Sequence, residues 1–161
     1  MSIFELDPYD NSQLEKIKVF EEENNCLDKP SKNIMEIIKN TSREEYYDSN
    51  KNEFEKIIIT EEDNAITDCY YICGEKDIKQ CKIISITKTH KKRKTTELVT
   101  DYALNNLGME EVFIPLSKED ENMITYLELS GYENLGEVDG NILLLKENQG
   151  KENSQRMISW I

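Results

Sequence analysis

The feature that most constrains this chain is a β-rich segment that runs into a cluster of cations and then into a helical pattern. Residues 81–87 (CKIISIT) favour a strand, residues 88–94 (KTHKKRK) carry five lysines or arginines, and residues 95–107 place apolar side chains at helical spacing. A helix N-terminus offers unpaired N–H groups and a partial positive charge, to which the basic side chains add full charges. The junction therefore predicts a site for a phosphate-bearing ligand.

The basic cluster contrasts with the charge of the whole chain. The formal net charge is −13, from 20 Lys and Arg against 33 Asp and Glu. Such a surface repels nucleic acid and anionic lipid and attracts cations. Residues 88–94 could also be a solvated loop, or a nuclear-import or nucleic-acid patch, although no second basic cluster supports the patch. We expect neither a nucleic acid nor a membrane as partner.

The cysteines and the N-terminus indicate the compartment. The first residues lack the cationic and apolar blocks of a signal peptide, and no apolar stretch approaches the roughly 20 residues that span a bilayer. We therefore expect a cytoplasmic protein with free thiols. Cys69 and Cys73 do not have a zinc-ligand spacing, and the chain has a single histidine, so we expect packed thiols and no metal.

The pattern along the chain predicts one domain over residues 1–147, followed by a polar linker and a short apolar tail over 148–161. Strands are expected at 3–6, 54–60, 65–73, 78–87, 112–116, 132–138 and 141–146, and helices at 12–24, 30–40, 95–107 and 118–130. Residues 41–53 are typical of a loop or a third short helix. A capping box at Ser12 and Glu15, and the pair Ser117 and Asp120, are expected to start two of the helices. The tail at 157–161 could pack on a partner, so a homodimer is possible.

This order of elements resembles the GNAT superfamily of acyl-coenzyme A-dependent N-acyltransferases. Residues 95–99 (TTELV) and 103–112 (ALNNLGMEEV) look like the central helix and following strand of that family, 125–132 (TYLELSGY) like its late helix, and 139–146 (DGNILLLK) like its closing hairpin. The match covers residues 54–147, and the N-terminal half matches by element order. The resemblance implies an α+β fold, with a mixed, mostly antiparallel twisted sheet of about six or seven strands and about four helices on both faces.

The resemblance also implies acetyl-coenzyme A as cofactor. The family binds it with Arg/Gln-x-x-Gly-x-Gly/Ala between the central strand and helix. Two registers fit this chain: His90, Arg93 and Thr95, or Lys91, Lys94 and Thr96. Neither contains glycine, which would let backbone approach a diphosphate closely, so the lysines would have to compensate. The pantetheine arm is then expected in a cleft where the central strand, at Ile84, Ser85 and Ile86, splays from residues 113–115.

Two catalytic groups follow from the resemblance. The family often uses a tyrosine on the late helix to protonate the departing thiolate, and Tyr126 lies one residue before the usual position, which falls on Leu127. A half-buried packing tyrosine is the alternative. For the general base, which can also be ordered water, Asp68 is favoured over Glu55 among strand acids. A surface carboxylate is the alternative there.

Three functions stay open at this point. The first is an N-acetyltransferase that acts on a primary amine of a cationic acceptor: a polyamine, an amino-sugar, or a lysine or N-terminal amine of a peptide. Acidic runs at 21–23 and 44–45 favour this acceptor class. The second is a catalytically weak or inactive GNAT-like domain that binds proteins or senses coenzyme A, as the glycine-free loop and the displaced tyrosine would allow. The third is an unrelated α+β binding protein.

Overall fold

The computed structural model describes residues 1–26, 29–86 and 92–148. In chain order the elements are β1 (Ser2–Glu5), α1 (Asn11–Glu23), α2 (Pro30–Asn40), α3 (Arg43–Tyr46), β2 (Glu53–Glu62), β3 (Ala65–Glu75), β4 (Gln80–Ser85), α4 (Lys92–Asn105), β5 (Glu111–Ser117), α5 (Glu121–Leu129), β6 (Glu133–Val138) and β7 (Asn141–Glu147). The fold class and the order of elements predicted from the sequence are confirmed. The short helix α3 lies within residues 41–53, where a loop or third short helix was expected.

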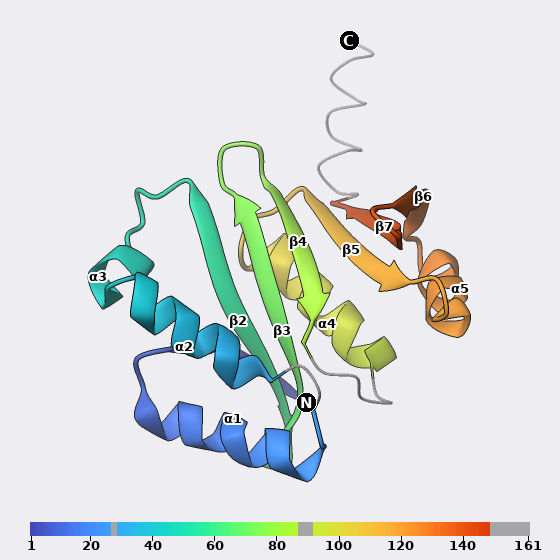
Figure 1. Cartoon of the computed structure of the whole chain (residues 1–161). Helices are drawn as coiled ribbons and strands as arrows, with labels where there is room; N and C mark the ends of the chain where they lie inside the picture. Colours follow the sequence, from blue (N-terminus) through green and yellow to red (C-terminus); the bar gives the residue numbers. More distant parts are fainter. Residues whose placement is uncertain (27–28, 87–91, 149–161) are drawn as a thin grey trace.

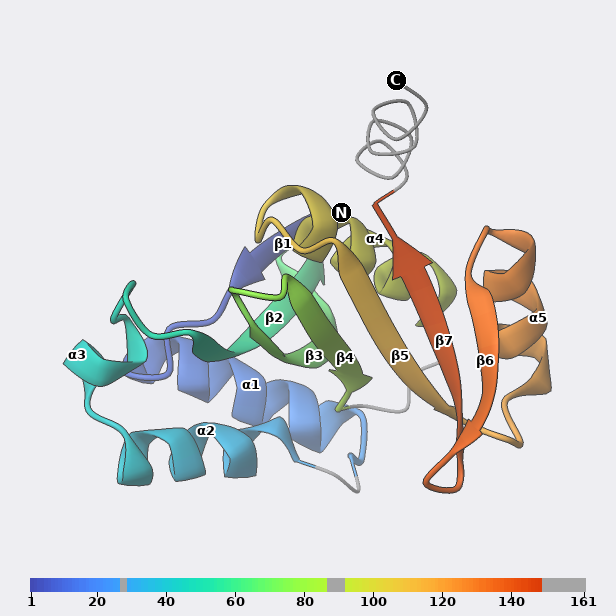
Figure 2. The same ribbon diagram turned by 90° about the horizontal axis from the view of Figure 1, so that it is seen from above.

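The strands form one seven-stranded sheet in the order β1-β2-β3-β4-β5-β7-β6 (Figures 1 and 2). Strands β1, β2, β3 and β4 form one antiparallel group, and β5, β7 and β6 form a second one. A single parallel pairing, between β4 and β5, joins the two groups. The predicted meander of three strands is therefore present. Arg93 and Lys94, the last two residues of the basic cluster, belong to α4 on the crossover from β4 to β5, and residues 88–91 lie outside the described residues.

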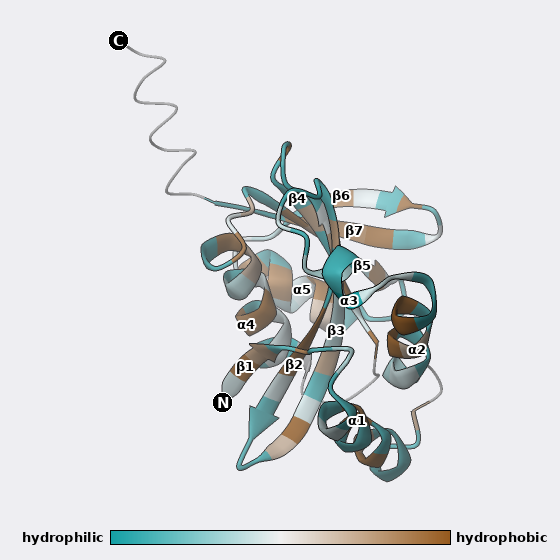
Figure 3. Cartoon of the chain, turned by 90° about the vertical axis from the view of Figure 1, so that its left-hand side faces the viewer, coloured by the Kyte–Doolittle hydropathy of each residue, from teal (hydrophilic) through white to brown (hydrophobic). Residues whose placement is uncertain are grey.

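Helices cover the sheet on both faces, and the alternation of side chains along β2 shows how. Ile57 and Ile59 pack with α1 and α2, whereas Ile58 points to the opposite face and packs with α4 and α5. All three isoleucines are fully buried, because β2 is covered on both sides. Along α1 and α2, hydrophilic and hydrophobic residues alternate (Figure 3), as expected for helices with one face on a sheet.

Three helix starts differ from the sequence prediction. The N-cap of α1 is Asp10, whose carboxylate accepts a hydrogen bond from the Ser12 N–H (2.9 Å), so Ser12 and Glu15 do not form a capping box there. Helix α5 begins at Glu121 after Asp120, which makes no side-chain cap hydrogen bond, instead of beginning at residue 118. Helix α4 begins at Lys92, three residues before the expected start.

None of the helices in the described parts of the chain has the length and apolar character that crossing a bilayer requires.

Candidate active site

The central feature of the candidate site is the early end of the β4–β5 ladder. The two strands pair at three positions, from Gln80 with Glu111 to Lys82 with Phe113, although both continue beyond these residues. Past that point β4 still pairs with β3, and β5 still pairs with β7. The strands diverge toward their C-terminal ends (Figure 1), so the sheet opens into the splay that the resemblance implied.

The backbone of β4 presents alternate residues to this opening. The Ile86 N–H donates to the Cys69 carbonyl of β3 (3.0 Å), and Ser85 is the neighbouring residue in the register. Because successive residues of a strand direct their backbone groups to opposite edges, Ile83 and Ser85 turn theirs toward the edge that β5 leaves. Of the three residues predicted to line the pantetheine arm, Ser85 has the suitable backbone orientation, and Ile83 was not anticipated.

Helix α4 begins near the end of β4, and its first turn contains the last two residues of the basic cluster. Arg93 and Lys94 are exposed and helical, so they lie in the first turn rather than in a preceding loop. This start agrees with the high helix propensity of arginine and lysine. His90 and Lys91, which were predicted to contact the cofactor, lie outside the described residues.

Beneath this turn lies a group of buried polar side chains. Its four members, drawn from β3 and α4, are almost inaccessible: Asp68 0 %, Tyr70 1 %, Thr95 0 % and Thr96 3 %. The Thr95 hydroxyl donates to the Asp68 carboxylate (3.2 Å), and the Tyr70 hydroxyl lies 2.6 Å from the Thr95 Oγ1 and 3.1 Å from the Thr96 Oγ1. Burial, followed by the nearby Asp68, raises the pKa of Tyr70 well above its ordinary value, so its phenol stays protonated.

This burial bears on the roles predicted for Asp68, Thr95 and Thr96. A general base must reach the proton that it removes, and Asp68 lies in the core with its carboxylate bonded to the Thr95 hydroxyl and the Cys69 N–H (2.8 Å). The threonine hydroxyls likewise point into the protein, away from a ligand at the helix N-terminus. The catalytic role of Asp68 stays a prediction.

Tyr126 lies on α5 against the first turns of α4. Its hydroxyl donates to the Glu97 carboxylate (2.7 Å), and the Arg93 guanidinium lies 5.3 Å from the centre of its ring. The hydrogen bond to Glu97 is the main reason that the pKa of Tyr126 is raised. Leu127, which occupies the position where the family usually has its tyrosine, is fully buried in the core under α4 and α5.

Comparison with known proteins decides which fold this is. No family model matches the chain, and no curated protein sequence matches it. Among solved structures, a spermidine N-acetyltransferase chimera of Vibrio cholerae SpeG and hSSAT is similar, with a TM-score of 0.66 and 11 % identity over 95 % of this chain and 99 % of that one. Campylobacter jejuni PseH, an N-acetyltransferase in complex with acetyl coenzyme A, gives 0.60 and 10 % over 91 % and 99 %.

FdhC, a nucleotide-linked sugar GNAT, gives a TM-score of 0.60 and 17 % identity over 98 % of this chain and 92 % of that one. This chain has the GNAT fold. Identities this low carry the fold alone, so the activity of this GNAT-fold protein has to be argued from its own residues.

The structure thus brings together the open edge of β4, the cationic first turn of α4 and Tyr126. The sequence did not single out Tyr70 or Glu97. A tyrosine in a β-rich run is ordinary, and its threonine partners lie 25 and 26 residues further along the chain. The one available sign was the pair of β-branched threonines at the start of a helix, where straight-chain residues are commoner.

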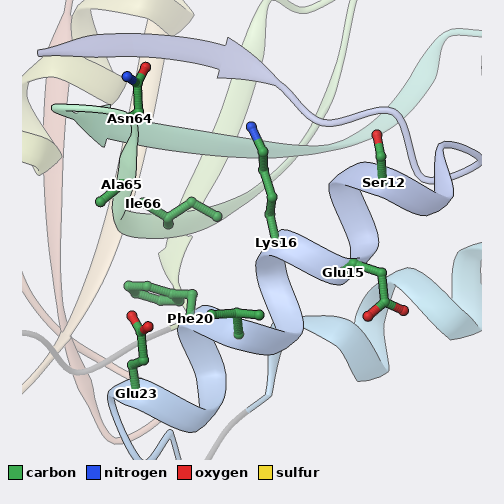
Figure 4. Close-up of a pocket in the computed structure, with 9 residues that line it drawn as sticks. Ser12, Glu15, Lys16, Phe20, Glu23, Asn64, Ala65 and Ile66 are labelled. Atoms are coloured by element: carbon green, nitrogen blue, oxygen red, sulfur yellow. The ribbon is translucent and has the colours of Figure 1, made fainter.

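A separate cavity of about 390 Å³ lies between α1 and the β2–β3 hairpin (Figure 4). Apolar Phe20, Ala65 and Ile66 contribute to its wall, and Lys16 projects toward the hairpin. None of the residues that line it belongs to the predicted cofactor or catalytic sets.

Proposed function

We propose that this protein is an acetyl-coenzyme A-dependent N-acetyltransferase that acetylates a primary amine. The observation that carries the proposal is the splay of β4 from β5, with the cationic first turn of α4 at the end of the same strand. An open strand edge suits the amide groups of a pantetheine arm, and a helix N-terminus with added cations suits a diphosphate.

Each part of the site has a role in this proposal. The edge of β4 beyond its last pairing with β5, which begins at the Ile83 carbonyl, binds the pantetheine arm, while the N–H groups of the first turn of α4, with Arg93 and Lys94, bind the phosphates. The set predicted from the sequence also includes residues to which the structure gives no such contact. The backbone groups of Ile84 and Ile86 face β3, and the hydroxyls of Thr95 and Thr96 point into the core. His90 and Lys91 lie outside the described residues. Bound acetyl-coenzyme A supplies the activated acyl group as a thioester. The chain then has to orient the acceptor amine and provide a proton for the thiolate that leaves.

Tyr126 is the candidate source of that proton. A phenol can protonate a thiolate within hydrogen-bond reach, and its ordinary pKa lies near that of a thiol. Here the hydroxyl is bonded to Glu97, which raises its pKa and directs its proton to α4. The role as general acid therefore requires the hydroxyl to leave Glu97 when the cofactor binds.

We propose a cationic amine as acceptor. The support is the net charge of −13, which draws polyamines, amino-sugars and lysine-containing peptides to the molecule. The similar structures include enzymes named for spermidine and for aminoglycoside acetylation, which is consistent with this class.

Calorimetric titration with acetyl-coenzyme A, followed by a thiol-release assay with a panel of amines, tests the proposal. We expect saturable binding that weakens with salt, and Arg93→Ala to weaken it by about tenfold through loss of a charge-assisted contact to phosphate. Lys39→Ala is the matched control, because Lys39 is an exposed cation on α2. Absence of binding at millimolar cofactor would refute the proposal.

A second function, binding of coenzyme A without transfer, is favoured by two observations. The Tyr126 hydroxyl is already engaged with Glu97, and the usual tyrosine position holds a buried leucine. Tight binding with no thiol release for any amine would identify the protein as a coenzyme A-sensing module.

A further inference from the structure

We propose that Tyr70 is a positioning residue that, together with Asp68, fixes the first turn of α4 and thereby aligns its N–H groups on the cofactor's diphosphate. This inference rests on the proposed function, because it concerns how the same site recognises its cofactor. It gives a role to a residue that the sequence did not single out and a different role to Asp68.

The hydrogen bonds of the buried group form one connected network. The Thr95 hydroxyl donates to the Asp68 carboxylate, and its oxygen lies 2.6 Å from the Tyr70 hydroxyl. The Tyr70 oxygen also lies 3.1 Å from the Thr96 hydroxyl, and in both tyrosine contacts either oxygen can be the donor. In one arrangement the protons run from Thr96 to Tyr70 to Thr95 and end on the Asp68 carboxylate, which only accepts, so that each bond polarises the next.

This network ties two consecutive residues of α4 to the middle of β3. Thr95 and Thr96 are the fourth and fifth residues of α4. Tyr70, which contacts both of them, lies on β3, the strand that pairs with β4. A further bond, from the Thr100 hydroxyl to the Thr96 carbonyl (2.7 Å), links the same segment to the next turn of the helix. Buried hydroxyls are costly unless they are bonded, so the first turn is stable chiefly in the orientation that satisfies all of them.

Because the segment predicted to bind the diphosphate contains no glycine, a fixed orientation of the first turn of α4 would help to bind the cofactor. A glycine loop brings backbone N–H groups to a diphosphate by adopting conformations that other residues avoid. Both registers of this chain lack glycine, so its N–H groups must be aligned by the placement of the helix itself. Preorganised donors bind without paying for their ordering at the moment of binding.

Apolar residues would fill the same space if the role were packing alone. The helix face that meets the sheet otherwise carries Val99 and Ala103, both fully buried. Three threonines, at 95, 96 and 100, interrupt that face, and each has its hydroxyl bonded. Thr95 and Thr96 lie near the N-terminus of α4, next to the cations Arg93 and Lys94, and Thr100 lies just past its middle.

The experiment compares acetyl-coenzyme A with acetyl-pantetheine, which lacks the diphosphate. In Tyr70→Phe we expect KM for acetyl-coenzyme A to rise by about tenfold, the effect of one buried hydrogen bond, with kcat changed by less than about twofold. The KM for acetyl-pantetheine should stay unchanged. Tyr132→Phe is the matched control, since Tyr132 is also buried in the same core cluster and lies near Thr100 rather than the first turn.

A second pair of variants protects the test against loss of folding. Thr95→Ser keeps the hydroxyl and should retain the wild-type KM for acetyl-coenzyme A, whereas Thr95→Val should raise it as Tyr70→Phe does. Equal rises for both acyl donors, or equal effects of Tyr70→Phe and Tyr132→Phe, would mean that the group is merely structural and overturn the inference. Wild-type protein that neither binds nor uses acetyl-coenzyme A would instead overturn the proposed function, and the inference with it.

Discussion

Cys81 illustrates how burial of a single group links stability to pH. Burial raises the pKa of its thiol to about 12, from an ordinary value of 9.0. Between those values the unfolded thiol ionises while the folded one keeps its proton, so the unfolded state binds fewer protons and the free energy of unfolding falls as pH rises. We expect a loss approaching about 1.4 kcal/mol per pH unit from this residue, measured by urea unfolding at about pH 8, 9 and 10. Cys81→Ala should make this slope shallower without removing it, because burial also raises the pKa of Cys69. An unchanged slope would contradict the assignment.

Variants of Tyr126 distinguish two roles of its side chain: the hydroxyl as general acid, and the ring as the surface beside which Arg93 lies. As the proposed general acid, Tyr126 should be needed for turnover, so we expect Tyr126→Phe to lower kcat by about a hundredfold or more at constant KM. Tyr126→Ala should also raise KM for acetyl-coenzyme A, because Arg93 loses the ring beside it. Steady-state kinetics as a function of pH measures both. A fall in kcat of less than about tenfold in Tyr126→Phe would show that the hydroxyl stays bonded to Glu97 and that the proton comes from another group.

The elements themselves were largely predictable, and their ends were not. The run of isoleucines at 57–59 predicted a strand correctly, since a strand covered on both faces needs no polar alternation. The start of α4 was missed because Thr95 resembles a capping residue, while Lys92 and the cations after it resemble a solvated loop. The splay of β4 from β5 came only from the resemblance, because strand divergence has no local sequence pattern. Tyr70 was missed because its role exists only across a tertiary contact.

Helix α5 offers a test at the level of the element, since two of its leucines differ almost completely in environment. Leu127 is fully buried in the main core cluster, whereas Leu129 is 85 % exposed. Leu127→Ala should lower the free energy of unfolding by about 3 kcal/mol, from lost burial and the cavity that remains. Leu129→Ala should change it by less than about 0.5 kcal/mol. Urea titration of both variants measures this, and similar losses would show that α5 does not pack as described.

At the scale of the whole molecule, two electrostatic fields of opposite sign act on the two substrates. The net charge of −13 attracts a cationic acceptor and repels the anionic cofactor, to which Arg93 and Lys94 in the first turn of α4 offer favourable charge. Cofactor binding therefore depends on short-range contacts, whereas acceptor capture includes a long-range contribution that salt screens over roughly 10 Å at about 0.1 M.

This difference predicts how acceptor choice responds to ionic strength. With saturating acetyl-coenzyme A, raising NaCl from about 50 to about 300 mM should reduce kcat/KM several-fold for a triamine, because screening weakens attraction in proportion to substrate charge. A monoamine with one charge should lose much less over the same range. Initial rates of thiol release for the two amines give both slopes. Parallel slopes would show that the acidic surface serves solubility alone, and the preference for a cationic acceptor would then have to come from contacts inside the acceptor site.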